Sequence, residues 1–316
     1  MGFILAASIA RRLGFAIGLL LVVSIAGFGL LRLMPGDFAE VLLMAQMDGE
    51  IPSAEALRTF EAEHNFDDPL PLQYLRWLGA VLTGDLGTSL VTGEPVGREI
   101  VLRLGNSLKL AVAALVLSLA IAIPIAFLAT RYRNGALDRV SAVVAVLGMS
   151  IPNFWYALLL ALLFSLTLGW LPSSGYGTWQ HAVLPTIVIG TSVCGVSARY
   201  IRSLLIDEVG RPYMRTAAMK GLGPIAALVR HAGPNVLPTI LTLAGLQFAR
   251  IFDGVIIVET LFGWPGIGRL LVDSLLNRDF PLIQACFLAI AVAYVLTNLV
   301  VDLAISAIDP RVREVV

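Results

Sequence analysis

Charged side chains and cysteine are both scarce in this chain. Only 14% of its 316 residues are Asp, Glu, Lys or Arg and 58% are hydrophobic, whereas about a quarter of the residues in an average soluble domain are charged. The formal net charge is zero, so no overall attraction to nucleic acid is expected. Cys194 and Cys286 stand in apolar runs and have neither disulfide nor metal spacing. The composition therefore excludes a soluble domain and predicts an all-α, polytopic membrane protein.

Motifs of catalysis are also missing. The chain has no phosphate-binding loop that ends in Lys-Ser or Lys-Thr, no dinucleotide fingerprint and no two histidines at a metal-binding helical spacing. Its three histidines, His64, His181 and His231, fall in three separate loops. We therefore expect no enzyme activity, no metal and no cofactor in this chain. Any energy that it uses would have to come from another chain.

Six stretches reach the roughly 20 apolar residues that a helix needs to cross a bilayer. The third contains Pro152 and exceeds a minimal span, and we expect it to be one long, kinked crossing. The predicted spans are Leu13–Leu33, Asn106–Thr130, Val140–Leu168, Ala182–Leu204, Val236–Phe262 and Pro281–Ile308.

Lys and Arg collect in alternate loops between these spans. Basic residues precede the first span, separate the second from the third and the fourth from the fifth, and follow the last. Because short cytoplasmic loops carry an excess of Lys and Arg, both termini are predicted to be cytoplasmic. The resulting parts are a terminus with the first span (1–34), an extracytoplasmic cap (35–105), five further spans (106–308) and a cytoplasmic tail (309–316).

The cap is rich in acidic residues and is predicted to fold into short helices. Ser53 can cap a helix that runs toward His64, and Pro71 can begin another. Glu94–Leu104 is amphipathic, with Val96 and Ile100 on one face, and is expected to lie in the membrane interface before the second span.

A polar and basic segment, Arg211–Pro238, interrupts the apolar sequence and predicts a cytoplasmic helical hairpin. Helix formers fill Tyr213–Lys220, and Gly221 and Gly223 can then end that helix in a left-handed turn. Pro224 can begin a second short helix that Gly233 closes. Such a rigid projection is expected of a membrane protein that is driven by an external motor.

The hairpin and seven further motifs resemble the permease subunits of ATP-binding cassette importers, and more narrowly the dipeptide and oligopeptide permease family. In the hairpin these residues are RTAAMKGL at 215–222, followed by Arg230, His231, Asn235 and Pro238. The other motifs are LMPGD at 33–37, PLQYLRW at 71–77, GDLGTS at 84–89, SIPNFW at 150–155, LGWLP at 168–172, VETLFGWPG at 258–266 and IDPR at 308–311.

This resemblance implies a type I importer fold in the bacterial inner membrane, with half of a translocation pathway in each of two homologous permeases. The implied partners are a second permease, two cytoplasmic ATPases that bind ATP and Mg, an extracytoplasmic solute-binding protein and membrane lipid. The ATPase is expected to contact one set of hairpin residues: Arg215, Thr216, Ala217, Ala218, Lys220, Gly221, Leu222, Gly223, Arg230 and His231.

Charged residues inside a span are costly unless they pair or face water, so they mark candidate pathway positions. Arg250 and Asp253 stand three residues apart, on one face of the fifth span. They could pair for structural reasons, or they could line the pathway together with Gln247 and Glu259. The family supplies no role for this pair.

Two classes of function remain open from the sequence. The first is the importer subunit, which would carry a short peptide or, with the same machinery, a nickel chelate, glutathione, an opine or an oligosaccharide. The second is a passive channel or a transporter driven by an ion gradient, in which buried acids such as Asp253 and Glu259 could relay protons. The hairpin favours the first class, because a gradient-driven carrier is not driven by a separate motor protein and needs no projecting structure to contact one.

Overall fold

The chain is helical throughout the part that the computed structural model describes, which comprises residues 2–32, 38–47, 50–64, 66 and 68–308. Within these residues the only strand-like pairing is an isolated bridge between Thr88 and Pro95, so the all-α prediction is confirmed. The LMPGD motif at 33–37 and the predicted tail at 309–316 lie outside the described residues. Two compact units form, Met1–Asn106 with Gly266–Val295 and Ser107–Pro265 with Leu296–Val316.

Several helices match predicted spans. Among the described residues, four stretches are long and apolar enough to cross a membrane: Val96–Arg131, Trp179–Val209, Pro224–Phe252 and Phe280–Val301. They correspond to α5 (Val96–Arg131), α8 (Trp179–Val209), α11 (Gly233–Leu261) with the turns before it, and α13 (Phe280–Ile308). The first predicted span lies in α1 (Gly2–Arg32), which contains a shorter apolar stretch, Gly14–Gly29.

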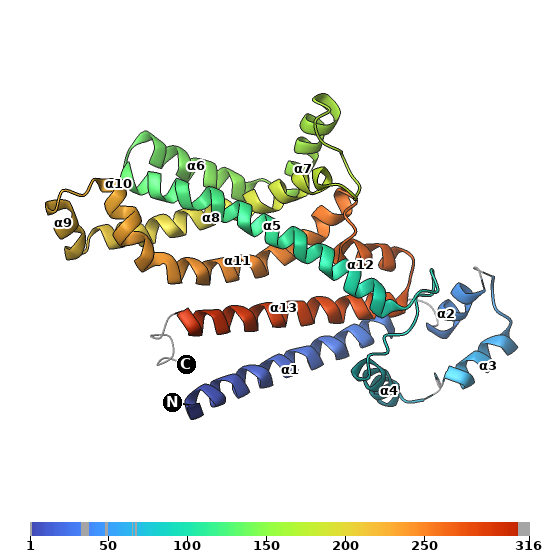
Figure 1. Cartoon of the computed structure of the whole chain (residues 1–316). Helices are drawn as coiled ribbons and strands as arrows, with labels where there is room; N and C mark the ends of the chain where they lie inside the picture. The colour runs from blue at the N-terminus through green and yellow to red at the C-terminus, as the bar shows by residue number, and fades with distance from the viewer. Residues whose placement is uncertain (1, 33–37, 48–49, 65, 67, 309–316) are drawn as a thin grey trace. The chain divides into compact units, whose positions relative to one another are not determined.

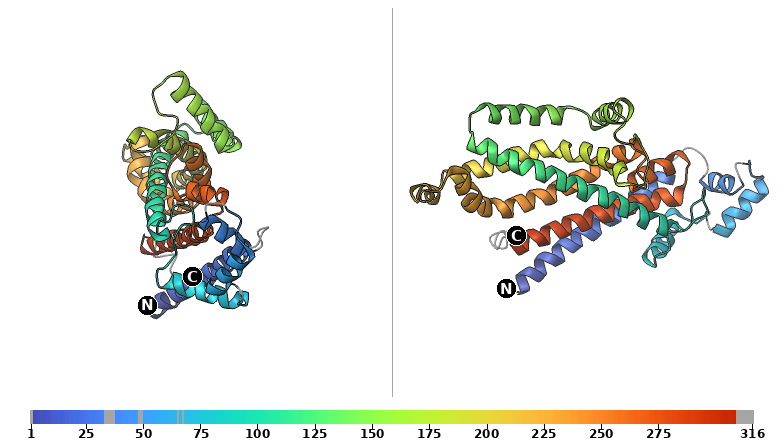
Figure 2. Two further views of the ribbon diagram at one scale, coloured as in Figure 1. Left: turned by 90° about the vertical axis from the view of Figure 1, so that its right-hand side faces the viewer. Right: turned by 45° about the horizontal axis from the view of Figure 1, so that its top comes forward.

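The third predicted span is two helices that meet at Pro152, the residue at which the sequence predicts a kink. α6 (Ala136–Ser150) and α7 (Asn153–Ala161), which continues into the π-helical η1 (Leu162–Thr167), are bent by 100° at their junction (Figure 2). Ile151 has an extended backbone because the ring of Pro152 disfavours the helical conformation in the preceding residue. That the pair makes one crossing stays a prediction.

The first unit contains the cap helices α2 (Phe38–Gln46), α3 (Ala54–His64) and α4 (Leu70–Leu82), as well as α12 (Ile267–Leu276). The Ser53 hydroxyl accepts a hydrogen bond from the N–H of Ala56 at 3.2 Å, which confirms the predicted cap of α3. The predicted amphipathic stretch is not separate from the second span. It forms the first turns of the 36-residue α5, whose residues Val96 and Ile100 pack in the core of this unit.

In the second unit α8 packs against α5, α6 and α11 (Figure 1). Two glycines of α8 allow the close approach. A Cβ on Gly190 would lie 2.8 Å from the carbonyl oxygen of Ala114 in α5, and one on Gly195 would lie 2.9 Å from the Cα of Ala145 in α6. Small residues at such contacts permit dense packing between membrane helices.

Gly195→Ala is therefore expected to destabilise the protein despite the higher helix propensity of alanine. The added methyl group overpacks the contact with Ala145, at a cost of about 1–3 kcal/mol. Gly148→Ala in α6 is the matched control, because a Cβ there meets nothing within 4 Å. Thermal unfolding in detergent should show a lower Tm for the first variant only, and equal Tm values would contradict the packing argument.

Candidate functional site

The hairpin predicted at 211–238 is a compact structure at the end of the second unit where α8 ends (Figure 1). Its first helix, α9 (Pro212–Met219), begins with a proline and ends at Gly221, whose φ of 84° is left-handed. The N–H of Leu222 bonds the carbonyl of Ala217 at 3.2 Å, and that of Gly221 bonds the carbonyl of Ala218 at 3.0 Å. This pair of bonds is a Schellman motif, which only a residue that tolerates positive φ completes without strain.

Two details of the predicted hairpin are wrong. Gly223 is extended, with φ −62°, and serves as the N-cap of α10 (Pro224–Ala227). Gly233 does not close the second helix, because its backbone is helical and the chain runs from α10 through the π-helical η2 (Leu228–Ala232) into α11. A π-turn changes the register of the backbone hydrogen bonds, which helps a helix to accommodate Pro234 without its N–H.

One face of the hairpin packs inward and the other is exposed. Met214 and Ala217 of α9 are buried in a core with Ala227 and Leu228. The predicted contribution of Ala217 to a partner surface is therefore corrected: this side chain is only 5% exposed and packs inside the unit. Leu222 is half-buried, whereas the remaining predicted contact residues are exposed: Arg215, Thr216, Ala218, Lys220, Gly221, Gly223, Arg230 and His231.

The base of the hairpin is held by Glu208, a buried acid at the end of α8. Its carboxylate accepts a hydrogen bond from the hydroxyl of Tyr213 and lies 2.8 Å from Nε of Arg211. Asn235, at the start of α11, donates from Nδ2 to the hydroxyl of Tyr213 at 2.9 Å and to Glu208 at 3.4 Å. The network thus joins α8, α9 and α11.

Tyr213 is protonated at neutral pH, and the network favours that form further. Burial and then the hydrogen bond to Glu208 raise the pKa of the Tyr213 hydroxyl above its usual value, so it remains a donor at neutral pH. Sequence reasoning missed Glu208 and Tyr213 as positioning residues. The available signal was an acid at the end of an apolar span, directly before a basic segment.

The four candidate pathway residues differ in their surroundings. Glu259 is fully buried and accepts a hydrogen bond from Ser107 at 2.5 Å, and Gln247 is buried and donates to Ser197 at 3.3 Å. Neither side chain can contact a solute in this conformation. Arg250 is exposed on α11, and the Asp253 side chain lies outside the described residues.

Comparison with known proteins identifies the class. Residues 122–314 match the family described as "Binding-protein-dependent transport system inner membrane component", and residues 5–111 match its N-terminal counterpart. The chain belongs to this family and is an inner-membrane permease of an ATP-binding cassette importer of the dipeptide and oligopeptide type. It is a multi-pass membrane protein.

Individual relatives match along nearly the whole chain. Over 305 residues, the chain is 39% identical to the glutathione transport system permease protein GsiC of Pectobacterium atrosepticum and 38% identical to that of Salmonella paratyphi A, covering 96% of this chain and 98% of each relative. Among solved structures, an inward-facing MetNI methionine ABC transporter matches with a TM-score of 0.58 at 14% identity, over 66% of this chain and 96% of the other. This last likeness confirms the importer permease fold.

Tyr213→Phe should loosen the hairpin, because it removes the donor to Glu208 and the acceptor for Asn235. A hydrogen bond to a charged group contributes about 1.5–3 kcal/mol. Hydrogen–deuterium exchange of the α9 amides should therefore accelerate by about tenfold or more. Tyr200→Phe, an exposed position on α8, is the matched control. Unchanged α9 exchange in the Tyr213 variant would show that the network does not hold the hairpin.

Proposed function

We propose that this permease forms half of the pathway through which an ATP-driven importer takes up a short peptide-like solute. We also propose that the hairpin contacts an ATPase and passes its movement to the membrane helices. The observation that carries this proposal is the hairpin itself. It is a helix with a fixed Schellman end, an exposed outer face and a base bonded to two membrane helices. A projection of that kind transmits displacement to the helices instead of deforming.

The substrate is proposed to be a short peptide, with glutathione as the specific candidate. The support comes from the relatives at 38–39% identity, which are named for glutathione transport, and from the family's dipeptide and oligopeptide type. Glutathione is itself a tripeptide. A nickel chelate, an opine or an oligosaccharide would use the same machinery, and competition for uptake of labelled glutathione by each compound would rank them.

The proposed partners are those that an importer of this class needs. Two ATPases would bind ATP and Mg and close against the hairpins, so we propose that this chain holds no cofactor of its own. A second permease would complete the pathway, and a binding protein would deliver the solute to the opposite side. A passive channel or a gradient-driven carrier is the weaker alternative, because its mechanism has no use for the hairpin.

Gly221→Leu tests the transmission of work. At φ 84° a side chain is strained, so the Schellman end of α9 should be lost while the membrane helices remain intact. We expect an assembled complex with ATP hydrolysis but about five- to thirtyfold less solute uptake, the factor to which a strain of 1–2 kcal/mol corresponds. Gly79→Leu, at an exposed position of α4 where a Cβ meets nothing within 4 Å, is the control. Normal uptake in the Gly221 variant would contradict the proposed role.

A cysteine at Lys220 tests the proposed orientation, in which the hairpin and both termini are cytoplasmic. After Cys194 and Cys286 are replaced by alanine, Lys220→Cys should react with a membrane-impermeant maleimide only when cells are opened. Thr178→Cys, at the other end of α8, should instead react in cells in which only the outer membrane has been made permeable. Labelling of Lys220→Cys in intact cells would reverse the topology.

A further inference from the structure

A cavity of about 730 Å³ lies in the second unit, beside the end of α8 that leads into the hairpin. Its walls come from the last turns of α5, the first half of α6 and the later part of α8. Three arginines and one aspartate line it: Arg139, Arg199, Arg202 and Asp138. The cavity is therefore positively charged, and the proposed function gives no use for it.

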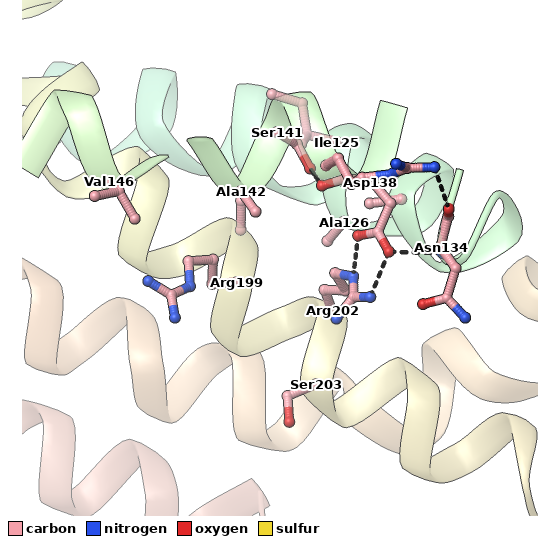
Figure 3. Close-up of a pocket in the computed structure, with 13 residues that line it drawn as sticks. Ile125, Ala126, Asn134, Asp138, Ser141, Ala142, Val146, Arg199, Arg202 and Ser203 are labelled. Atoms are coloured by element: carbon pink, nitrogen blue, oxygen red, sulfur yellow. Dashed lines mark hydrogen bonds and ion pairs between the residues drawn. The ribbon is translucent and has the colours of Figure 1, made fainter. Parts of the chain in front are cut away.

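The arginines differ in how far their charges are compensated. Asp138 pairs with Arg202 in a two-point contact, Nε to Oδ1 at 2.6 Å and Nη2 to Oδ2 at 2.7 Å (Figure 3). Within the part of the chain that the structure describes, the Arg139 side chain bonds only a backbone oxygen, that of Asn134, at 3.3 Å. Among the described residues, Arg199 has neither a hydrogen bond nor an ion pair, and Figure 3 shows its guanidinium pointing away from the Asp138–Arg202 pair. Two arginine charges thus remain available to an anion.

A second cavity, of about 390 Å³, continues from the first and is apolar. The two share Ile125, Ser141 and Ala198 in their walls. The second extends along α6 past Val144 and Gly148 to the break at Ile151. Together they form a groove between α5, α6 and α8, with arginines at the hairpin end and an apolar lining toward the α6–α7 break. We call it the arginine groove.

We propose that the arginine groove binds an anionic phospholipid, with its phosphate at Arg139 and Arg199 and an acyl chain along the apolar part. Basic pockets between membrane helices at the cytoplasmic surface bind anionic head groups, and each Lys or Arg near that surface contributes about 1 kcal/mol. A peptide would not suit the apolar part, because its backbone groups would be left without hydrogen-bond partners there. The placement of the phosphate relies on the proposed cytoplasmic orientation, whereas the groove itself does not.

The lipid would also have a structural consequence. A bound lipid would lie against Arg139 on α6 and Arg199 on α8, and its acyl chain would cover the contact between these helices. The lipid would thus stabilise the helix pair next to the hairpin. We expect the complete transporter to be more thermostable in the anionic lipid than in a zwitterionic one.

Native mass spectrometry of the complete transporter tests the site with two probes, phosphatidylglycerol and phosphatidylcholine of identical acyl chains. We expect preferential retention of phosphatidylglycerol. Arg139→Gln and Arg199→Gln should each lower the affinity of the transporter for phosphatidylglycerol, calculated from the bound fraction, by about fivefold. Arg133→Gln, which removes an arginine from the turn before α6 and outside the groove, is the matched control and should have little effect.

The apolar half has its own test. Gly148→Phe should fill the groove without a clash inside the chain, since a Cβ there meets nothing within 4 Å, and should lower retention of phosphatidylglycerol. Gly148→Ala is its control. Cross-linking of a photoactivatable phosphatidylglycerol to α6 or α8 of the wild-type complex gives a readout that needs no variant to fold.

Three results would overturn the proposal: equal retention of the two lipids, unchanged retention in the groove variants, or displacement of the lipid by glutathione at transport concentrations. The last result would assign the groove to the solute pathway. None of these measurements requires transport, so a failure of the lipid site leaves the proposed import function untouched. Normal uptake in Gly221→Leu, which would contradict the proposed function, would likewise not affect the lipid result.

Discussion

The carboxylate of Glu208 imposes the main constraint on the functional end of the molecule. An acid that is mostly removed from solvent must be compensated by hydrogen bonds or an opposite charge, and this one is compensated by groups from segments that are distant in sequence. Arg211 and Tyr213 come from the chain that leaves α8, and Asn235 comes from the start of α11. Satisfying one buried charge therefore fixes the direction in which the chain leaves the membrane and returns to it. The exposed face of α9 is positioned by that requirement, because Met214 and Ala217 must pack in the core on its opposite side.

Contacts in the rest of the second unit hold α8 and this end of the molecule in place. α8 is packed through Gly190 and Gly195 against α5 and α6, so the helices cannot move closer together at these two contacts. Farther from the hairpin, the buried Glu259 of α11 accepts a hydrogen bond from Ser107 of α5. At the opposite end, the N–H of Gly175 bonds the carbonyl of Phe262 at 2.8 Å and Tyr176 packs edge-on against Trp264. These contacts tie the loop before α8 to the end of α11. α8 and α11 are thus connected to each other at both ends.

The sequence was sufficient for features that depend on local chemistry. Ser53 as a helix cap, Gly221 as a left-handed helix end and the break at Pro152 each follow from the preferences of one or two residues. Features that depend on tertiary contacts could not be predicted. The π-turn that carries the helix through Gly233 results from packing and from proline accommodation, although glycine and proline locally indicate a stop. The burial of Ala217 and the pairing of Glu208 with Tyr213 and Asn235 require knowledge of which faces meet. Glu259 looked like a pathway residue because a charged residue in a span indicates function, and only the structure reveals its enclosed hydrogen bond to Ser107.

The central claim is that α9 moves as one body with α8 when the transporter cycles. Spin labels on Thr216 of α9 and Tyr200 of α8, both exposed, would report on it by double electron–electron resonance in the complete transporter. A narrow distance distribution that is the same without nucleotide and with trapped ATP is the result that the account predicts. A distribution that shifts or broadens between these states would show that the hairpin flexes on its base, and it would contradict the account.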